Sequence, residues 1–157
     1  IFYKEGNYEV IEFDLNKRFN MSDIYIIEKF DNSKIYTVLY KDGKSKQYFI
    51  KRFKIETLLL DKKFYLIPET RGTKCKLISK FNKLTVSYNY KLKNNDKVSK
   101  EINVNDFIEI KGYKAVGKRL DNKSHMSGFA FKEIVNEKNE EDSAESENKE
   151  NNELTLF

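Results

Sequence analysis

The sequence has few of the residues that build catalytic and metal sites: its 157 residues include one histidine, one cysteine and no tryptophan. The single cysteine, Cys75, cannot form an internal disulfide, which excludes a disulfide-stabilised scaffold and is typical of a reducing compartment. His125 has no second histidine and no cysteine near it in the sequence, so metal ligands and a nucleophile–base pair are both lacking. We therefore interpret Cys75 as a small core residue and His125 as a loop residue.

Other signatures are missing as well. No apolar run approaches the ~18 residues of a membrane-spanning helix, and no charged and then apolar leader precedes a cleavage site. Residues 111–118 contain glycine and lysine, but Arg119 stands where a phosphate-binding loop needs Ser or Thr to hold magnesium. We expect a soluble cytoplasmic protein with no cofactor and no catalytic residue of its own. Because the chain opens at Ile1, inside an apolar run and without an initiating Met, we also expect a fragment of a longer polypeptide.

The net charge of +5 conceals two regions of opposite sign. Residues 133–157 contain nine acidic residues and two lysines, so they carry −7 and residues 1–132 carry the remaining +12. A surface this basic attracts polyanions at long range and binds them in a salt-sensitive way. A composition rich in lysine, asparagine and isoleucine is also expected from AT-rich codons, so the charge alone does not identify nucleic acid as the partner.

The strongest local pattern is a hairpin in residues 35–54, IYTVLYKDGKSKQYFIKRFK. Two apolar and aromatic runs flank Asp42 and Gly43, and Asp-Gly between such runs is a strong hairpin signal. We predict a tight turn in which Gly43 adopts a positive φ. Alternation places Ile50 and Arg52 on one face of the second strand and Lys51 and Phe53 on the other, so neither face is wholly polar. We expect a hairpin buried along its length and cationic at one end.

Similar hairpins are predicted at Gly6 and Asn82, which gives a coarse period of about 40 residues, as in propeller-like blades. The aromatic residues suit sheets, and no segment keeps the apolar spacing of an amphipathic helix. We predict an all-β fold of four-stranded antiparallel blades, about three of them, in a domain of residues 1–132. Residues 133–157 have too little apolar content to fold and are predicted to be a disordered acidic tail.

Basic residues cluster at the predicted turns and strand ends, where a blade architecture would place them along a rim. Any single lysine can be a solvated surface residue, but the shared placement favours contacts with phosphates. The absence of a recognition helix or an aromatic RNA-binding motif favours binding to backbone and shape. The candidate DNA-binding residues are Lys44, Lys46, Lys51, Arg52, Lys54, Arg71, Lys74, Lys76, Lys111, Lys114, Lys118 and Arg119.

Two runs, YKDGKSKQYFIKRF at residues 40–53 and FIEIKGYKAVGKRL at residues 107–120, resemble the C-terminal domain of the A subunit of bacterial type IIA DNA topoisomerases. The resemblance covers most of residues 1–132. It implies a β-pinwheel, a propeller variant whose basic rim binds and bends double-stranded DNA and presents it to the cleavage core. The box rich in glutamine, arginine and glycine that gyrases use for wrapping is absent, which favours a topoisomerase IV-like protein over a gyrase.

The same resemblance implies what this chain does not hold. The family's catalytic tyrosine follows an arginine in a separate breakage-reunion domain, and no Arg-Tyr pair occurs here. ATP and magnesium would be bound by other domains or by the B subunit, and the A subunit would dimerise through missing domains. These relations imply a cytoplasmic, nucleoid-associated enzyme.

The acidic tail supports three alternative interpretations. Leu154, Leu156 and Phe157 at its end resemble the short peptide that bacterial proteins insert into the replicative sliding clamp, which would make the chain a protein-interaction module. Alternatively, the tail mimics DNA and competes for the basic rim, or it only keeps the protein soluble. The sequence leaves these alternatives open.

Overall fold

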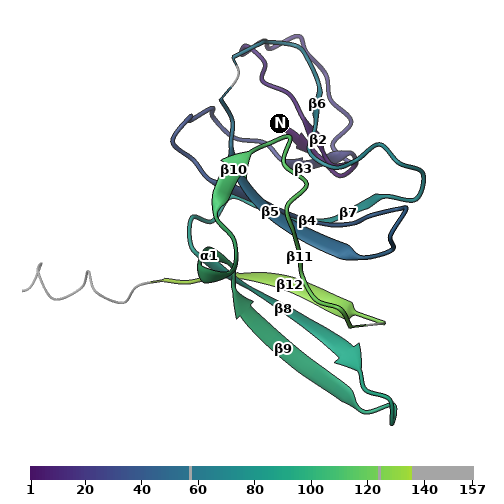
Figure 1. Cartoon of the computed structure of the whole chain (residues 1–157). Helices are drawn as coiled ribbons and strands as arrows, with labels where there is room; N and C mark the ends of the chain where they lie inside the picture. Colours follow the sequence, from purple (N-terminus) through teal and green to yellow (C-terminus); the bar gives the residue numbers. More distant parts are fainter. Residues whose placement is uncertain (57, 124, 136–157) are drawn as a thin grey trace, which may run out of the picture.

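The computed structural model describes residues 1–56, 58–123 and 125–135, which form twelve strands and one short helix (Figure 1). The first sheet has the order β3-β1-β2-β6, with β1 (Phe2–Tyr3), β2 (Asn7–Tyr8), β3 (Ile24–Ile26) and β6 (Phe64–Tyr65). The second has the order β10-β5-β4-β7, with β4 (Tyr36–Lys41), β5 (Tyr48–Lys54), β7 (Lys74–Ser79) and β10 (Ile110–Gly112), and β11 (Lys118–Arg119) also pairs with β5. The third has the order β12-β8-β9, with β8 (Leu84–Lys91), β9 (Lys97–Asn103) and β12 (Ser127–Glu133).

These sheets confirm the predicted all-β class. Their number matches the three units expected, and they contain four, five and three strands respectively. Pairing is antiparallel between the named strands except for β10, which runs parallel to β5. The helix α1 (Val104–Phe107) has four residues, and the Asn103 side chain caps its N-terminus by accepting a hydrogen bond from Asn105 N. Among the described residues, the structure contains no helical segment that could span a lipid bilayer.

The second sheet lies between the other two, as Figure 1 shows, and it contributes to two hydrophobic cores. Tyr36, Val38 and Tyr40 of β4 pack into the core shared with the first sheet. Leu39 of the same strand and Ile50 of β5 pack into the core shared with the third sheet. Alternation along a strand therefore buries both faces of the central hairpin, which explains why neither face is wholly polar.

The predicted hairpin of residues 35–54 is confirmed, because β4 and β5 pair from Tyr36↔Phe53 to Lys41↔Tyr48. The predicted conformation of Gly43 is wrong: its φ is not positive, and Lys46 takes the left-handed conformation in this turn. Gly43 is required for a different reason, since a Cβ there would lie 2.2 Å from Arg71 O. The glycine allows the turn to touch the loop before β7.

The hairpin at Gly6 is present, with φ +87° at the glycine between the paired strands β1 and β2. The hairpin predicted at Asn82 is wrong. β7 pairs with β4, where Ile78 lies opposite Val38 in the first core, and β8 pairs with β9 and β12 in the next sheet. Asn82 therefore lies where the chain passes from one sheet to another, and burial of Ile78 against β4 decides this pairing.

The chain after Leu120 adds a strand that no pattern predicted. Phe129 and Phe131 of β12 pack against the second core, and β12 pairs with β8 as far as Glu133↔Leu84. Ile134 N then donates a hydrogen bond to Lys83 O at 3.0 Å, so paired structure continues past the predicted boundary at residue 132. Residues 136–157, with Leu154, Leu156 and Phe157, lie outside the described residues.

Candidate nucleic-acid interface

A first cluster of cations lies where the turn between β4 and β5 meets the loop before β7. Gly43 N donates a hydrogen bond to Thr73 Oγ1 at 2.9 Å, and a Cβ on Gly72 would lie 3.5 Å from Lys46 Nζ. Four of the predicted DNA-binding residues are thereby brought together and are exposed. With the half-buried Lys41 they form the β4–β5 patch, which consists of Lys41, Lys44, Lys46, Arg71 and Lys74.

A second cluster lies at the turn between β8 and β9, closed by a hydrogen bond from Leu92 N to Asp96 O at 2.9 Å. Its members are exposed and form the β8–β9 patch, which consists of Lys91, Lys93, Lys97 and Lys123. The sequence-based prediction missed this patch, because none of these lysines was among the candidate DNA-binding residues. The signal that could have found it is the run KLKNNDK, in which lysines bracket a polar turn.

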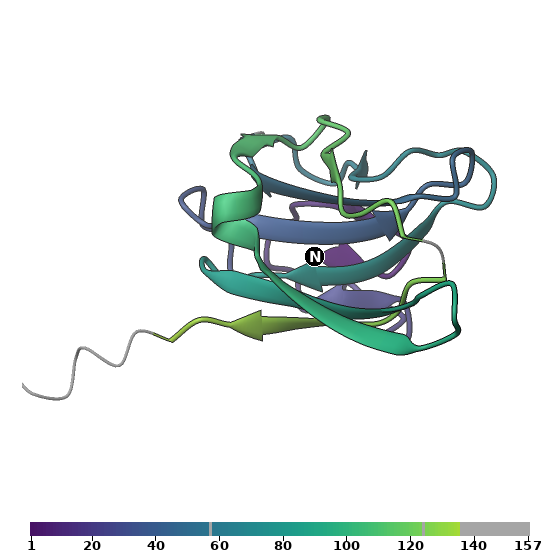
Figure 2. The same cartoon turned by 60° about the horizontal axis from the view of Figure 1, so that its bottom comes forward.

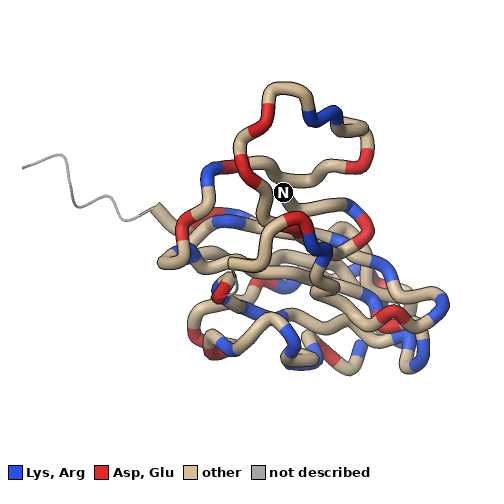
Figure 3. Tube along the Cα trace, turned by 90° about the horizontal axis from the view of Figure 1, so that it is seen from above, with Lys and Arg blue, Asp and Glu red and all other residues tan. Residues whose placement is uncertain are grey.

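A row of aromatic rings connects the two patches. Lys41 Nζ lies 5.5 Å from the centre of the Tyr48 ring, and Lys123 Nζ lies 5.3 Å from that of Tyr90. Neighbouring rings then follow one another between these two tyrosines. The ring centres are 4.5 Å apart for Tyr48 and Phe129, 6.1 Å for Phe129 and Tyr88, and 6.5 Å for Tyr88 and Tyr90. Both turns lie at the end of the strands away from α1 (Figure 2), where blue segments outnumber red ones at the right of Figure 3.

Each patch contains two lysines paired directly across strands. Lys41 lies opposite Lys74 between β4 and β7, and Lys91 lies opposite Lys97 between β8 and β9. Like charges in directly opposed positions destabilise a sheet by ~0.2–1 kcal/mol per pair. Two such pairs at the same end of the molecule are a cost to folding that an anionic partner would offset.

Two of the carboxylates at this end, Asp42 and Asp121, accept hydrogen bonds from neighbouring side chains. Hydrogen bonds from Ser45 lower the pKa of Asp42. Burial alone would raise the pKa of Asp121, but hydrogen bonds from Lys100 Nζ at 2.8 Å and Tyr88 OH at 2.7 Å outweigh it and lower that pKa to about 2. Both groups are therefore ionised at neutral pH. Asp121 is engaged with partners outside the two patches, whereas Asp42 accepts from Ser45 and also interacts with Lys44 of the β4–β5 patch.

The other predicted cations occupy different places. Lys76 is exposed on β7, and Lys54 is half-buried at the end of β5, where it lies opposite Gly112. Lys118 Nζ donates a hydrogen bond to Phe107 O at 3.1 Å and lies 4.2 Å from the centre of that ring. Lys118 is one of four exposed cations that follow β5 on the side where β10 and β11 pair with it. We call this side the β10–β11 edge, and its cations are Lys111, Lys114, Lys118 and Arg119.

Lys51 and Arg52 do not face solvent, so the expectation that they point outward with the other cations is wrong. Only 3% of Lys51 and 5% of Arg52 is exposed, because both faces of β5 are covered by neighbouring sheets. Lys51 Nζ donates to Tyr113 O at 2.5 Å and to Ala115 O at 3.0 Å, and Arg52 donates to Asn82 O at 3.0 Å. Burial lowers the pKa of Lys51 to about 8. Both cations serve the fold.

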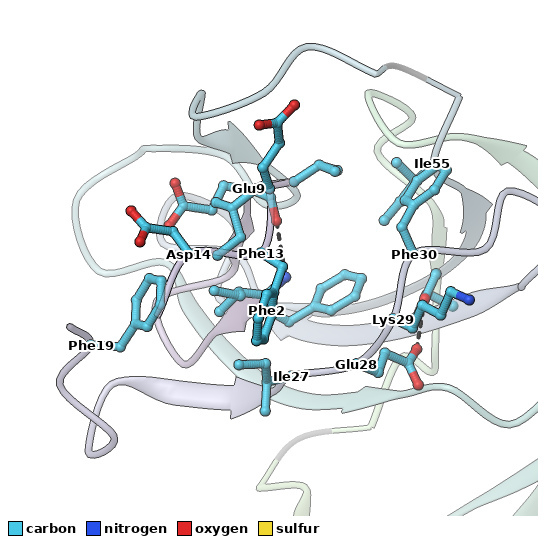
Figure 4. Close-up of a pocket in the computed structure, with 15 residues that line it drawn as sticks. Phe2, Glu9, Phe13, Asp14, Phe19, Ile27, Glu28, Lys29, Phe30 and Ile55 are labelled. Carbon is cyan, nitrogen blue, oxygen red and sulfur yellow. Dashed lines mark hydrogen bonds between the residues drawn. The ribbon is translucent and has the colours of Figure 1, made fainter. Parts of the chain in front are cut away.

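A pocket of about 770 Å³ lies in the N-terminal part of the molecule, where Figure 4 shows the residues that line it. Its walls are mainly apolar, with Phe13, Phe19, Ile27 and Phe30 among them. The Glu28 carboxylate at its edge accepts hydrogen bonds from Lys34 and Tyr36 at 2.7 Å, so it is already paired. The other charged side chains that line it include Glu9, Glu12, Asp14 and Lys29.

The described residues contain no group of three or more His, Cys, Asp or Glu side chains placed to hold a metal ion. Burial raises the pKa of the Cys75 thiol to about 12, so Cys75 is a protonated residue packed against the first core, as predicted. His125 is exposed in the loop before β12, also as predicted. The surface cations are therefore the features with the clearest chemical use.

The like-charge pairs allow a stability test of the interface. Lys74→Glu is expected to raise the free energy of unfolding by ~0.5 kcal/mol, because it turns repulsion with Lys41 into attraction. Lys76→Glu is the matched control, since Lys76 falls in the register irregularity of β7 and has no Cα partner on β4. Urea denaturation of both variants measures the difference. Equal or lower stability of the Lys74 variant relative to the control would contradict the interpretation.

Comparison with known families agrees with the resemblance of residues 40–53 and 107–120. A family model described as the topoisomerase C-terminal domain of Bacteroidota matches residues 1–127, which include both patches and the β10–β11 edge. No curated protein matches the chain, and no solved structure matches it. The chain belongs to the family of topoisomerase C-terminal domains described for Bacteroidota, and it is therefore part of a topoisomerase.

Proposed function

We propose that this domain binds double-stranded DNA as a non-catalytic accessory domain of the A subunit of a type IIA topoisomerase. The observation that carries the proposal is the convergence of two lysine patches at one end of the molecule, each with a like-charge pair across its strands. Such pairs reduce stability in the free protein and are relieved by phosphates. The family assignment makes DNA the polyanion of choice.

Binding through these patches is directed to the backbone of the duplex. Lysine is a point charge suited to phosphate, and α1, the helix found among the described residues, has only four residues, too few to read bases in a major groove. Affinity should therefore depend little on sequence. Because the patches lie on different sheets, a duplex that touches both is expected to bend around this end of the domain and to be guided toward the cleavage core.

The same proposal assigns the other functions of the enzyme to parts outside this domain. The A subunit would supply the cleavage domain and the dimer contacts, and the B subunit would bind ATP; magnesium would also be held outside this domain. The role of the domain is to position a DNA segment during relaxation or decatenation. Docking to a sliding clamp through Leu154, Leu156 and Phe157 remains a second prediction, which falls on residues outside those described.

Salt dependence tests the proposal. Eight exposed cations belong to the two patches: Lys44, Lys46, Arg71, Lys74, Lys91, Lys93, Lys97 and Lys123. If about six of them meet phosphates, the logarithm of the association constant is expected to fall with the logarithm of salt concentration at a slope near −5. Fluorescence anisotropy with a labelled 30-base-pair duplex, titrated at several salt concentrations, measures the slope.

The control is a second duplex of equal length and unrelated sequence. Equal affinities, within about threefold, are expected because the contacts are to phosphates. A slope close to zero, or a strong preference for one duplex, would contradict binding by the two patches.

A further inference from the structure

The loop of residues 113–117, between β10 and β11, bridges a gap in the strand pairing along β5. β11 pairs with Phe49 and Ile50 in the antiparallel direction, whereas β10 pairs with Arg52, Phe53 and Lys54 in the parallel direction. Lys51 is the residue between these two segments. The backbone groups of the loop therefore face a position at which β5, paired with β4 on its other side, has no partner strand on this edge.

The side chain of Lys51 fills this gap. Its Nζ donates to Tyr113 O at 2.5 Å and to Ala115 O at 3.0 Å, so one buried amine holds two carbonyls of the loop. Tyr40 on the neighbouring strand β4 donates from its hydroxyl to Val116 O at 2.7 Å. Three of the five loop residues are thus fixed by side chains from the central hairpin.

Packing fixes the loop at two further points. The Tyr113 ring packs edge-on against the rings of Tyr8 and Phe64, with ring centres 5.8 Å and 5.6 Å apart. It therefore anchors the loop in the first core. At the other end, Gly117 has φ +93°, and a Cβ there would lie 2.5 Å from Ile50 O. The loop therefore lies directly against β5 with little freedom to move.

The exposed cations of the β10–β11 edge lie on this loop and at its two ends. Lys114 is within the loop, Lys111 precedes it, and Lys118 follows it. Long lysine side chains lose rotamer entropy when they bind a phosphate, and a rigid backbone limits the further entropy that must be lost. A loop held in this way presents its cations in a fixed spacing.

We propose that Lys51 and Tyr40 are positioning residues that hold the 113–117 loop so that Lys111, Lys114 and Lys118 act together as a third phosphate-binding element. The inference rests on the proposed DNA-binding function and extends it to an edge of the sheet separate from the two patches. In this role Lys51 acts through the loop and does not itself contact DNA. A buried lysine is suited to this task because an apolar side chain would leave both loop carbonyls without a donor.

A double-mutant cycle between Lys51 and Lys114 tests the proposal, with affinity for a 30-base-pair duplex as the readout. Lys114→Ala alone is expected to weaken binding about fivefold, the effect of one lost phosphate contact near 0.15 M salt. In a Lys51→Met background the same substitution is expected to have almost no effect, because the loop cations are no longer held in place. Lys74→Ala, in the β4–β5 patch, is the matched control and should weaken binding by a similar factor in both backgrounds.

Two further measurements keep the test decisive if the Lys51 variant is poorly stable. Tyr40→Phe removes only the hydroxyl and keeps the ring stacked on Phe49, with ring centres 5.6 Å apart. Its coupling with Lys114→Ala should therefore have the same sign as that of Lys51→Met but be smaller. Amide hydrogen exchange in free Lys51→Met should increase at residues 114–117 and remain unchanged in β8. Full additivity of Lys51 with Lys114, or unchanged exchange in the loop, would overturn the inference.

The outcomes separate this inference from the proposed function. Additivity at Lys114 together with a clear loss of affinity in Lys74→Ala would overturn the positioning role alone. Salt-insensitive binding that neither Lys74 nor Lys114 affects would overturn DNA binding through these cations, and with it the phosphate-binding role of the loop.

Discussion

Reversing four charges of the β4–β5 patch is expected to abolish most DNA binding. In the variant Lys44→Glu, Lys46→Glu, Arg71→Glu and Lys74→Glu, four exposed cations that lie together are replaced by anions. Each lost phosphate contact lowers the salt slope by about 0.9, so the slope should fall by nearly 4 and the affinity by roughly 10³-fold near 0.15 M salt. Repulsion between the new carboxylates and phosphates increases the loss. The same anisotropy titration measures both quantities.

A matched variant separates the effect of net charge on DNA affinity from the effect of where the charges lie. Lys4, Lys29, Lys62 and Lys63 are exposed on or beside the first sheet, and their replacement by Glu changes the net charge by the same amount. If the β4–β5 patch is the contact surface, this control should lose about tenfold or less, because long-range attraction is screened beyond ~8 Å at physiological salt. Equal losses in the two variants would show that only the overall charge matters.

Gly43→Ala is expected to cause a large loss of stability through a single methyl group. The new Cβ would lie 2.2 Å from Arg71 O and 2.6 Å from Thr73 N, both of them backbone atoms that cannot rotate away. The turn must then move, and the hydrogen bond from Gly43 N to Thr73 Oγ1 is lost. Overpacking costs ~1–3 kcal/mol and the lost bond ~1 kcal/mol, so the free energy of unfolding should fall by ~2–4 kcal/mol.

The effect should also reach the interface, because the same contact keeps Lys46 beside Gly72 and next to Arg71. Urea denaturation and DNA anisotropy on the folded variant measure the two consequences. Gly112→Ala is the matched control, since a Cβ there meets no atom within 4 Å and its φ is not positive. That control should be neutral or slightly stabilising. Similar stabilities of the two alanine variants would contradict the role assigned to Gly43.

Much of the fold could be predicted from local sequence. Alternation of apolar residues in residues 35–54 correctly predicted a hairpin buried on both faces, because the period of two is set by strand geometry. The glycine turn at Gly6 and the abundance of aromatic residues were equally local signals. The third hairpin was not predictable in this way. Asn82 and Lys83 look like a turn, but the partner of β7 is decided by burial of Ile78 against Val38, forty residues earlier.

The candidate site was predicted only in part, for the same reason. Charge and turn position identified Lys44, Lys46, Arg71 and Lys74, which do lie together. They could not show that Lys51 is covered on its face of β5, since that depends on a loop more than sixty residues later in the chain. Nor could they show that the β8–β9 turn lies at the same end as the β4–β5 turn.

By itself, the sequence determined the all-β class, the central hairpin, the basic character of residues 1–132 and the topoisomerase family, because these depend on composition, on strand alternation and on the runs at residues 40–53 and 107–120, all of which are local features. The tertiary structure alone decided which cations face solvent. Burial depends on neighbours that are distant in the chain, so a lysine that supports a loop and a lysine that is free to meet a phosphate have the same local sequence signature.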